Sequence, residues 1–374
     1  MTALRKILSA LLVVSDAYAE RRRAHPVLTR FVCTVVLTAS ALFATYFLDP
    51  LTNFNLAIGA SMAIVILGLS FLTGASGQVS LGNGAFMGIG AYAVAIWANH
   101  HSTTPIVGAL ALATVVGAVV GLLIGLPATR LRGPYLAGMT IALALAFEPL
   151  VATFGSWTNG DTPISINQVT PPGWLASFLN ASTSDLRPTN MWLADISIVV
   201  TGIAFFFMAN LFRSRTGRAM RLVRENEVAA ELAGISLPRA RVTAFMVSAA
   251  YAGLGGGLYT LVSGNAQSGF FNLALSITIL SLLVIGGIGT LSGALLGGLI
   301  YAYSQNWIDW LEAKTGVSAT SNFGGNLKGI IFGMALILIM LLAPMGIAGT
   351  IRFVIIRVGR NLRLARPSPG TTPQ

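Results

Sequence analysis

Charged residues are scarce in this chain. Only 9% of its 374 residues are Asp, Glu, Lys or Arg, whereas a soluble domain carries about a quarter. So few charges exclude an ordinary soluble fold and indicate an integral membrane protein. The 80 residues of 50–129 and the 67 residues of 242–308 contain no charged side chain at all. Because a spanning helix needs about 20 apolar residues, each run is long enough to cross a membrane several times.

Residues that usually carry chemistry are also few. The single cysteine, Cys33, lies in an apolar run, which excludes an internal disulfide and a cysteine metal cluster. None of the three lysines follows a glycine, so the chain lacks the loop that cradles nucleotide phosphates. The three histidines, His25, His100 and His101, lie near the N-terminus or in a predicted outer loop. We therefore expect no catalytic site, no metal site and no cofactor bound by this chain.

Apolar runs of helical length predict an all-α polytopic bundle of about eight to ten transmembrane segments. The expected spans are 31–48, 54–74, 80–98, 105–127, 134–155, 191–212, 241–262, 275–304 and 327–347. As a single helix, 275–304 would be about 45 Å long, which exceeds a hydrocarbon core of about 30 Å. The glycine-rich stretch 286–293 within it therefore predicts a hairpin of two shorter helices, and glycine-rich broken or re-entrant helices are expected in the bundle.

Basic residues predict which side of the membrane each connection faces. With a cytoplasmic N-terminus, 20 of the 23 lysines and arginines fall on the cytoplasmic side, and the outer loop 156–190 holds only Arg187. The net charge of +11 is then explained by the orientation of the chain in the membrane. We expect membrane lipid, but no nucleic acid, among its partners. The expected parts are an amphipathic cytoplasmic segment at 1–30, a transmembrane domain at 31–347 with a cytoplasmic segment at 213–240, and a basic cytoplasmic tail at 348–374.

Glycines and polar residues interrupt two of the apolar runs. The first stretch reads "SGQVSLGNG" over 76–84, and the second reads "GGIGT" over 286–290. Close helix packing through small residues explains most glycines of the chain. Broken helices, however, mark substrate sites in many transporters. We expect both interruptions to face one translocation path, with candidate residues Gln78, Ser80, Asn83, Gly286, Gly287 and Gly289.

Acidic side chains inside the predicted spans are limited to Glu148 and Asp195, and Asp195 is expected at the interface. Glu148 precedes Pro149, which kinks a helix and frees a backbone carbonyl. Glu148 either lines the translocation path or pairs with a neighbouring helix, and both interpretations stay open. A stand-alone secondary transporter that uses an ion gradient through Glu148 is therefore an alternative function. A proton relay usually needs more than one ionisable group within the membrane, which argues against this alternative.

The basic segment 213–240 reads "RSRTGRAMRLVRENEVAAELAGISLPRA". It predicts a helix with Arg218, Arg221 and Arg224 on one face. A short helix follows, with an end at Gly234 and a turn at Leu237–Pro238. This compact unit exceeds what a tether needs and is typical of a docking surface.

Four stretches of the chain resemble branched-chain amino acid ABC-transporter permeases of the LivM type. They are "SGQVSLGNGAFMGIGAYAVA", "GSWTNGDTPIS", "GRAMRLVRENEVAAELAGISLPRARVTAFMVSAAYAGLGGGLY" and "LLVIGGIGTLSGALLGGLI", and they fall in the order of that family. The resemblance implies a multi-pass permease subunit of a binding-protein-dependent importer in the bacterial inner membrane, with both termini cytoplasmic. It also implies three kinds of partner: a second related permease, two ATPase subunits that use ATP, and a soluble periplasmic substrate-binding protein.

The resemblance further assigns a docking role to part of the basic segment. A variant of the E-A-A…G motif that docks on an ATPase subunit would comprise Glu227, Ala229, Ala230, Gly234, Leu237 and Pro238, and Arg224 is expected to join these residues in ATPase coupling. Branched-chain amino acids are the expected substrates, and other amino acids, urea or short amides remain alternatives. A membrane enzyme or scaffold is the third class, and the sequence supplies no chemistry for it.

Overall fold

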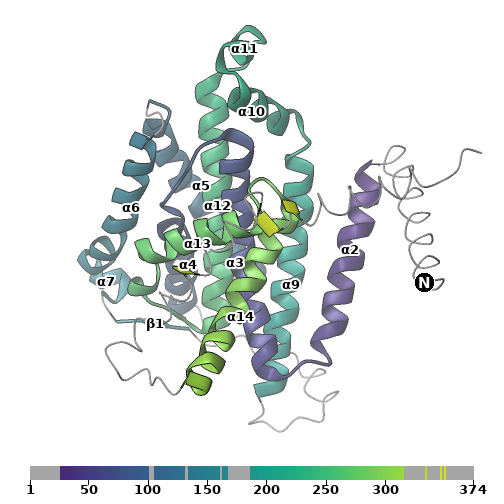
Figure 1. Ribbon diagram of the computed structural model, residues 1–374. Coiled ribbons are helices and arrows are strands. Elements are labelled where there is room, and N and C mark those ends of the chain that lie inside the picture. The colour runs from purple at the N-terminus through teal and green to yellow at the C-terminus, as the bar shows by residue number, and fades with distance from the viewer. Residues whose placement is uncertain are drawn as a thin grey trace, which may run out of the picture.

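The computed structural model describes residues 26–100, 105–130, 134–160, 162–166 and 186–315, together with 333–334, 346–347 and 349–350. These residues form a bundle of long helices (Figure 1). The helices are α2 (Pro26–Thr45), α3 (Pro50–Ser76), α4 (Asn83–His100), α5 (Ile106–Ala128), α6 (Pro134–Thr153), α7 (Gly155–Thr158), α9 (Leu186–Leu211), α10 (Arg215–Glu225), α11 (Glu227–Leu232), α12 (Leu237–Ser263), α13 (Leu273–Gly286) and α14 (Leu291–Thr315). Two short strands, β1 (Ile164–Ser165) and β2 (Asn265–Ala266), and a 3-10 turn, η1 (Ser268–Phe270), are also present.

Helix length and composition confirm an all-α polytopic membrane protein. In the described part of the chain, six helices are long and apolar enough to cross a membrane: α2, α3, α5, α6, α9 and α12. The predicted hairpin at 275–304 is confirmed, because α13 and α14 are separate helices that pack against each other. The second helix continues past the predicted limit of 304 to Thr315. Residues 1–25 of the expected segment 1–30, most of the span 327–347 and most of the tail 348–374 lie outside the described residues. Residues 26–30 belong to α2, so the first span begins earlier than predicted.

The helix α12 forms the centre of the bundle, where it packs against α3, α4 and α5 (Figure 1). Small residues make this packing close. Gly117 and Gly121 of α5 lie against Ala249 and Gly253 of α12, and Gly256 lies against the backbone of α4. Backbones approach this closely only where side chains are small. The predicted role of these glycines in helix packing is therefore confirmed.

The helices α2 and α6 stand at opposite flanks of the bundle (Figure 1). On its flank, α2 packs against α9. Polar contacts tie this pair at both ends: Arg30 Nη1 donates to Asn210 Oδ1 at 2.7 Å, and Thr45 Oγ1 donates to Asp195 Oδ1 at 2.8 Å. The carboxylate of Asp195, the tenth residue of α9, thus meets the last residue of α2. Its expected position at the membrane interface stays a prediction.

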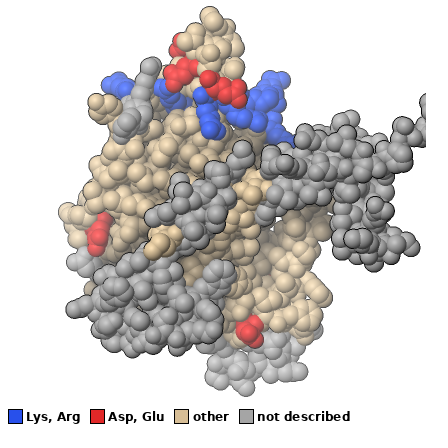
Figure 2. Space-filling view, viewed as in Figure 1, with Lys and Arg blue, Asp and Glu red and all other residues tan. Residues whose placement is uncertain are grey.

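The two ends of the bundle differ in charge. The short helices α10 and α11 project from one end, and arginine side chains gather there beside several acidic ones, so we call it the basic end (Figures 1 and 2). At the opposite end β1 and β2 pair antiparallel, with Ile164 opposite Ala266. This pairing joins the connection after α6 to the chain that leaves α12.

Candidate functional site

The first predicted interruption separates α3 from α4. Helix α3 ends at Ser76, Gly77 adopts a left-handed conformation with φ 74°, and α4 begins at Asn83. Two side chains from other helices satisfy the backbone here. Leu81 N donates to Thr140 Oγ1 of α6 at 3.0 Å, and Gly84 N donates to Ser276 Oγ of α13 at 2.9 Å. The first break, residues 77–82, is therefore held between α6 and α13.

Buried polar atoms gather in and around the first break. Ser80 and Asn83 are each 1% exposed. Ser80 Oγ accepts a hydrogen bond from Gly82 N at 3.3 Å, but three other buried atoms lack a partner among the described residues: Thr73 Oγ1, Gln78 Nε2 and Asn83 Oδ1. Buried polar groups are normally hydrogen-bonded to protein or water. The first break thus offers spare donors and acceptors to water or a polar solute.

The second interruption, residues 287–290, lies directly beside the first. Helix α13 ends at Gly286 and α14 begins at Leu291, with Gly287 and Gly289 at φ 114° and 75°. A methyl group placed on Gly74, in the last turn of α3, would overlap the Cα atom of Gly289. The fold therefore brings the two breaks together, whereas their common exposure to a translocation path stays a prediction.

The carboxylate of Glu148 lies apart from the first break. On α6 it is eight residues beyond Thr140, about 12 Å along the helix axis. Its side chain is exposed, near Gly269 of η1, and has no ion-pair or hydrogen-bond partner among the described residues. An ionised group is costly in contact with lipid, so Glu148 is expected to face water or another protein.

The basic segment folds into a compact unit on the basic end. Side chains of Ser214 and Asn226 cap the starts of α10 and α11, as is usual for these residue types. Val223, Ala230 and Leu237 form a small apolar core between α10, α11 and α12. The unit is thus a packed extension of the bundle rather than a free loop.

One detail of the predicted segment is confirmed and another is wrong. Gly234 terminates α11 with φ 78°, as expected of a glycine at a helix end. The turn predicted at Leu237–Pro238 is wrong, because both residues belong to the first turn of α12. Proline suits this position, since the first turn of a helix leaves its backbone N–H groups unpaired. The turn falls instead at 233–236.

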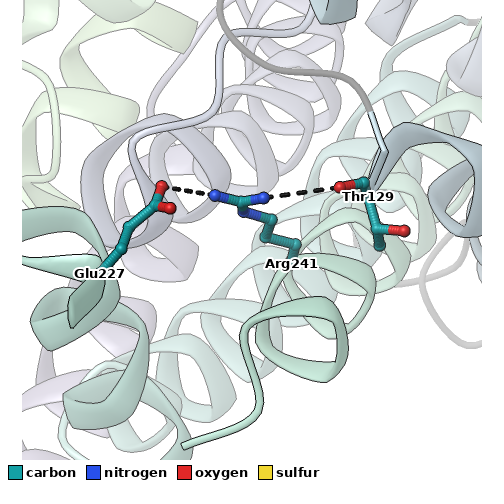
Figure 3. A network of polar contacts seen from close by, with 3 residues as sticks. All are labelled: Thr129, Glu227 and Arg241. Atoms are coloured by element: carbon teal, nitrogen blue, oxygen red, sulfur yellow. Dashed lines mark hydrogen bonds and ion pairs between the residues drawn. The ribbon is translucent and has the colours of Figure 1, made fainter. Parts of the chain in front are cut away.

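Arg241 links α12 to α11 and to the chain just after α5 at the base of this unit (Figure 3). Arg241 of α12 pairs with Glu227 of α11 and also donates to the carbonyl of Thr129, which follows α5. The Arg241 side chain is 14% exposed and the Glu227 side chain 43%. The Glu227 carboxylate therefore braces α11 against the bundle.

The remaining docking candidates divide by exposure. Ala230 and Leu237 are buried in the small core, and Ala229 is half-buried. Gly234 and Pro238 are exposed, and Arg224 donates to the carbonyl of Gly74 in α3.

The sequence analysis missed the two most exposed apolar side chains of α11, Val228 at 66% and Leu232 at 85%. Their spacing of four residues on one helix face was the available signal. We call Val228, Leu232 and Gly234 the α11 face.

Comparison with known families agrees with this architecture. A family model described as "Branched-chain amino acid transport system / permease component" matches residues 52–340, which is most of the chain. The chain belongs to this family. The matched range contains both breaks of this permease, its basic segment and its central helix α12.

Individual relatives of the permease carry related names. The high-affinity branched-chain amino acid transport system permease proteins LivM of Salmonella typhimurium and Escherichia coli are 32% and 31% identical over 258 residues, which is 65% of this chain. These matches span 60% of the length of either relative. LivH of Salmonella typhimurium is 24% identical over 314 residues, which is 81% of this chain and 96% of that protein. No solved structure matches the chain.

Proposed function

We propose that this permease is a membrane subunit of an ABC importer for branched-chain amino acids. The observation that carries the proposal is the match to a family described as a permease component of branched-chain amino acid transport. The packed unit of α10 and α11 on the helix bundle is the structural feature that agrees with it. The names of its LivM and LivH relatives support the substrate class. ATP would be bound and hydrolysed by separate subunits.

The basic end is proposed to face the cytoplasm of a bacterial inner membrane. Arginines are concentrated in the basic segment and gather at that end of the bundle (Figure 2). Cytoplasmic connections of membrane proteins carry such an excess of positive charge. The β1–β2 pair would then lie outside, on the side from which a soluble binding protein delivers the substrate.

The α11 face is proposed to receive the ATPase subunit. Val228 and Leu232 expose apolar surface at the tip of a charged unit, and a methyl group on Gly234 would meet no atom within 4 Å. Exposed apolar side chains surrounded by charged ones are typical of a protein-binding site. Glu227, Ala230 and Leu237 would support this face from behind rather than contact the partner directly.

Purification of the complex tests the proposal. The tagged permease is extracted from native membranes in a mild detergent, and the copurified proteins are identified by mass spectrometry. We expect two ATPase subunits and a second permease. Gly234→Arg is expected to lose the ATPase subunits but keep the second permease, because the new side chain would stand on the α11 face.

Two controls are needed: Gly234→Ala for the strain of a side chain at φ 78°, and Thr216→Arg, at an exposed position on α10 outside the α11 face, for added charge. Both variants should retain the ATPase subunits. A native permease that purifies without any ATPase, even after cross-linking, would contradict the proposed function. Equal ATPase recovery with Gly234→Arg would contradict the docking surface alone. ATP-driven uptake of radiolabelled leucine, compared with urea, by the reconstituted complex then tests the substrate class.

One observation favours a second candidate function. The exposed Glu148 has no partner among the described residues and would suit a carrier that couples transport to an ion gradient. Such a carrier works without other subunits. Uptake by the purified permease alone, driven by a proton or sodium gradient and abolished by Glu148→Gln, would favour this function over the importer.

A further inference from the structure

Arg224 reaches from the basic segment into the end of a membrane helix. Its guanidinium donates a hydrogen bond to the carbonyl of Gly74, in the last turn of α3. Its aliphatic stem lies over Gly77, where an added methyl would come within 3.0 Å of Arg224 Cγ. The last carbonyls of a helix lack partners within the helix, and the helix dipole makes them attractive to a cation. Arg224 thus caps α3 from outside the helix.

The capped turn of α3 touches both helix breaks. Gly77, beneath the Arg224 stem, is the first residue of the break at 77–82. Gly74, whose carbonyl accepts the hydrogen bond, packs directly on Gly289 of the break at 287–290. A methyl group added to Gly346 would in turn overlap the Cα atom of Gly287. One side chain of α10 is therefore connected to both breaks through a single helical turn.

We propose that Arg224 is a positioning residue that transmits movement of α10 to the two helix breaks. This inference rests on the proposed importer function, and it separates Arg224 from the ATPase-docking set to which the sequence assigned it. When an ATPase subunit shifts the α10–α11 unit, the guanidinium carries the end of α3 with it. Glycine at positions 74 and 289 leaves no side chain between the breaks, so a shift of α3 reaches both.

Arg221 provides a matched control on the same helix. Its Nη2 donates to the carbonyl of Phe212 at 2.7 Å, just after the end of α9. This is the same kind of bond, from an arginine of α10 to a carbonyl at the end of a membrane helix. Helix α9 runs unbroken to Leu211, and the helices it packs against are α3, α2 and α12. Loss of the Arg221 bond should therefore leave the breaks undisturbed.

The test uses the complete transporter in proteoliposomes, with its ATPase subunits, second permease and binding protein. Three quantities are measured: copurification of the ATPase subunits, leucine uptake per ATP hydrolysed, and the rate at which a water-soluble maleimide labels a cysteine at position 78. For the labelling measurement alone, the cysteine is introduced as Gln78→Cys in a Cys33→Ala background, since Cys33 is the single native cysteine, and uptake is measured with native Gln78. Labelling is compared with and without ATP.

Arg224→Gln is expected to keep the ATPase subunits and their hydrolysis but to reduce uptake per ATP at least tenfold. It should also abolish the ATP-dependent change in labelling at position 78, which a merely structural role would not affect. Arg224→Lys should retain part of the uptake per ATP and part of the ATP-dependent change in labelling, because an ammonium group also donates to a carbonyl. Arg221→Gln should behave like the native complex.

Two results would overturn the inference. Loss of the ATPase subunits from the Arg224→Gln complex would make Arg224 a docking residue. Native uptake per ATP with Arg224→Gln would show that the bond to Gly74 transmits nothing. A native complex that shows no ATP-driven uptake would instead overturn the proposed function, and with it the basis of this inference.

Discussion

At the scale of the residue, glycine has two separate tasks in this permease. Most glycines let helices touch, as Gly256 does where α12 meets the Met87 carbonyl of α4. A few supply a left-handed backbone where a helix must end, as Gly77 and Gly234 do. The two tasks respond differently to mutation, because an added methyl group meets a neighbouring backbone in the first case and strains φ in the second.

Gly256→Ala is expected to destabilise the permease. The new methyl group would overlap the Met87 carbonyl, a backbone atom that cannot rotate away, so α12 and α4 would have to separate. Overpacking of this kind typically costs about 1–3 kcal/mol. A lower melting temperature of the purified protein in detergent would show it.

Gly138→Ala is the control for this substitution. Gly138 lies within α6, and a methyl group there meets no atom within 4 Å. Alanine also favours a helix over glycine by up to about 1 kcal/mol. This variant should melt at or slightly above the native temperature. Equal losses in both variants would show that contact with Met87 is not the cause.

At the scale of the element, the sequence predicted helices better than their contacts. Run length and charge were sufficient for the six long apolar helices, whereas α4, predicted as a span at 80–98, is not among them. The excess length of 275–304 revealed the α13–α14 hairpin. The start of α12 was missed because Leu237–Pro238 suits a turn and a helix start equally well. The pairing of Glu227 with Arg241 was not predicted, since both lie in a segment with many charges of each sign.

The position of Arg224 illustrates the same limit for the candidate site. Helical periodicity correctly placed Arg218, Arg221 and Arg224 on one helix. It could not indicate that the Arg224 guanidinium turns to Gly74, because that contact joins residues 150 positions apart. The two breaks were visible as runs of glycine and polar residues, but their adjacency through Gly74 and Gly289 depends on how α14 packs along α3.

The ion pair of Glu227 and Arg241 is expected to hold α11 on the bundle. Glu227→Gln should raise amide hydrogen exchange in 227–234 about fivefold, which corresponds to about 1 kcal/mol for a partly exposed ion pair. Exchange measured by mass spectrometry on the purified permease provides the test. Arg241→Gln removes the same ion pair and, in addition, the 3.5 Å bond to Thr129, so it should give at least a similar increase, and the double variant should exceed Arg241→Gln by little.

Glu231→Gln is the control on the same helix, since its exposed carboxylate has no partner among the described residues. Exchange in this variant should match the native protein. Fully additive effects of Glu227→Gln and Arg241→Gln would contradict the brace, because independent changes would then act on α11. About 1 M salt should narrow the difference between native and Glu227→Gln proteins, since screening weakens the exposed side of the pair.

At the scale of the whole molecule, the two flanks of the bundle differ in what they expose. The α2 flank presents apolar side chains such as Val36, which lipid can cover. The α6 flank also presents apolar side chains, including Leu145, but carries the exposed carboxylate of Glu148 one turn further along. A carboxylate in lipid is unfavourable, so the α6 flank is where a second permease or a water path is expected in the assembled transporter.

Photo-cross-linking from each flank tests this arrangement. A photoreactive residue at Leu145 of α6 is expected to form an adduct with the second permease subunit in native membranes. The same residue at Val36 of α2, with 59% exposure against 58% for Leu145, should form no protein adduct. Adducts from Val36 alone would place the partner on the opposite flank and leave Glu148 to face the membrane or a path within one subunit.

The central position of α12 shapes how the permease is made. Helix α12 begins 109 residues after α5 ends, yet it fills the space between α3, α4 and α5. At a synthesis rate of roughly 5–20 residues per second, the residues between α5 and α12 take on the order of 5–20 s to synthesise. For that time α3, α4 and α5 lack the helix that packs between them. During that interval their glycine faces are open to the insertion machinery and to other nascent helices. The close packing that stabilises the finished bundle therefore makes the half-synthesised chain the form most exposed to mispairing and to membrane proteases.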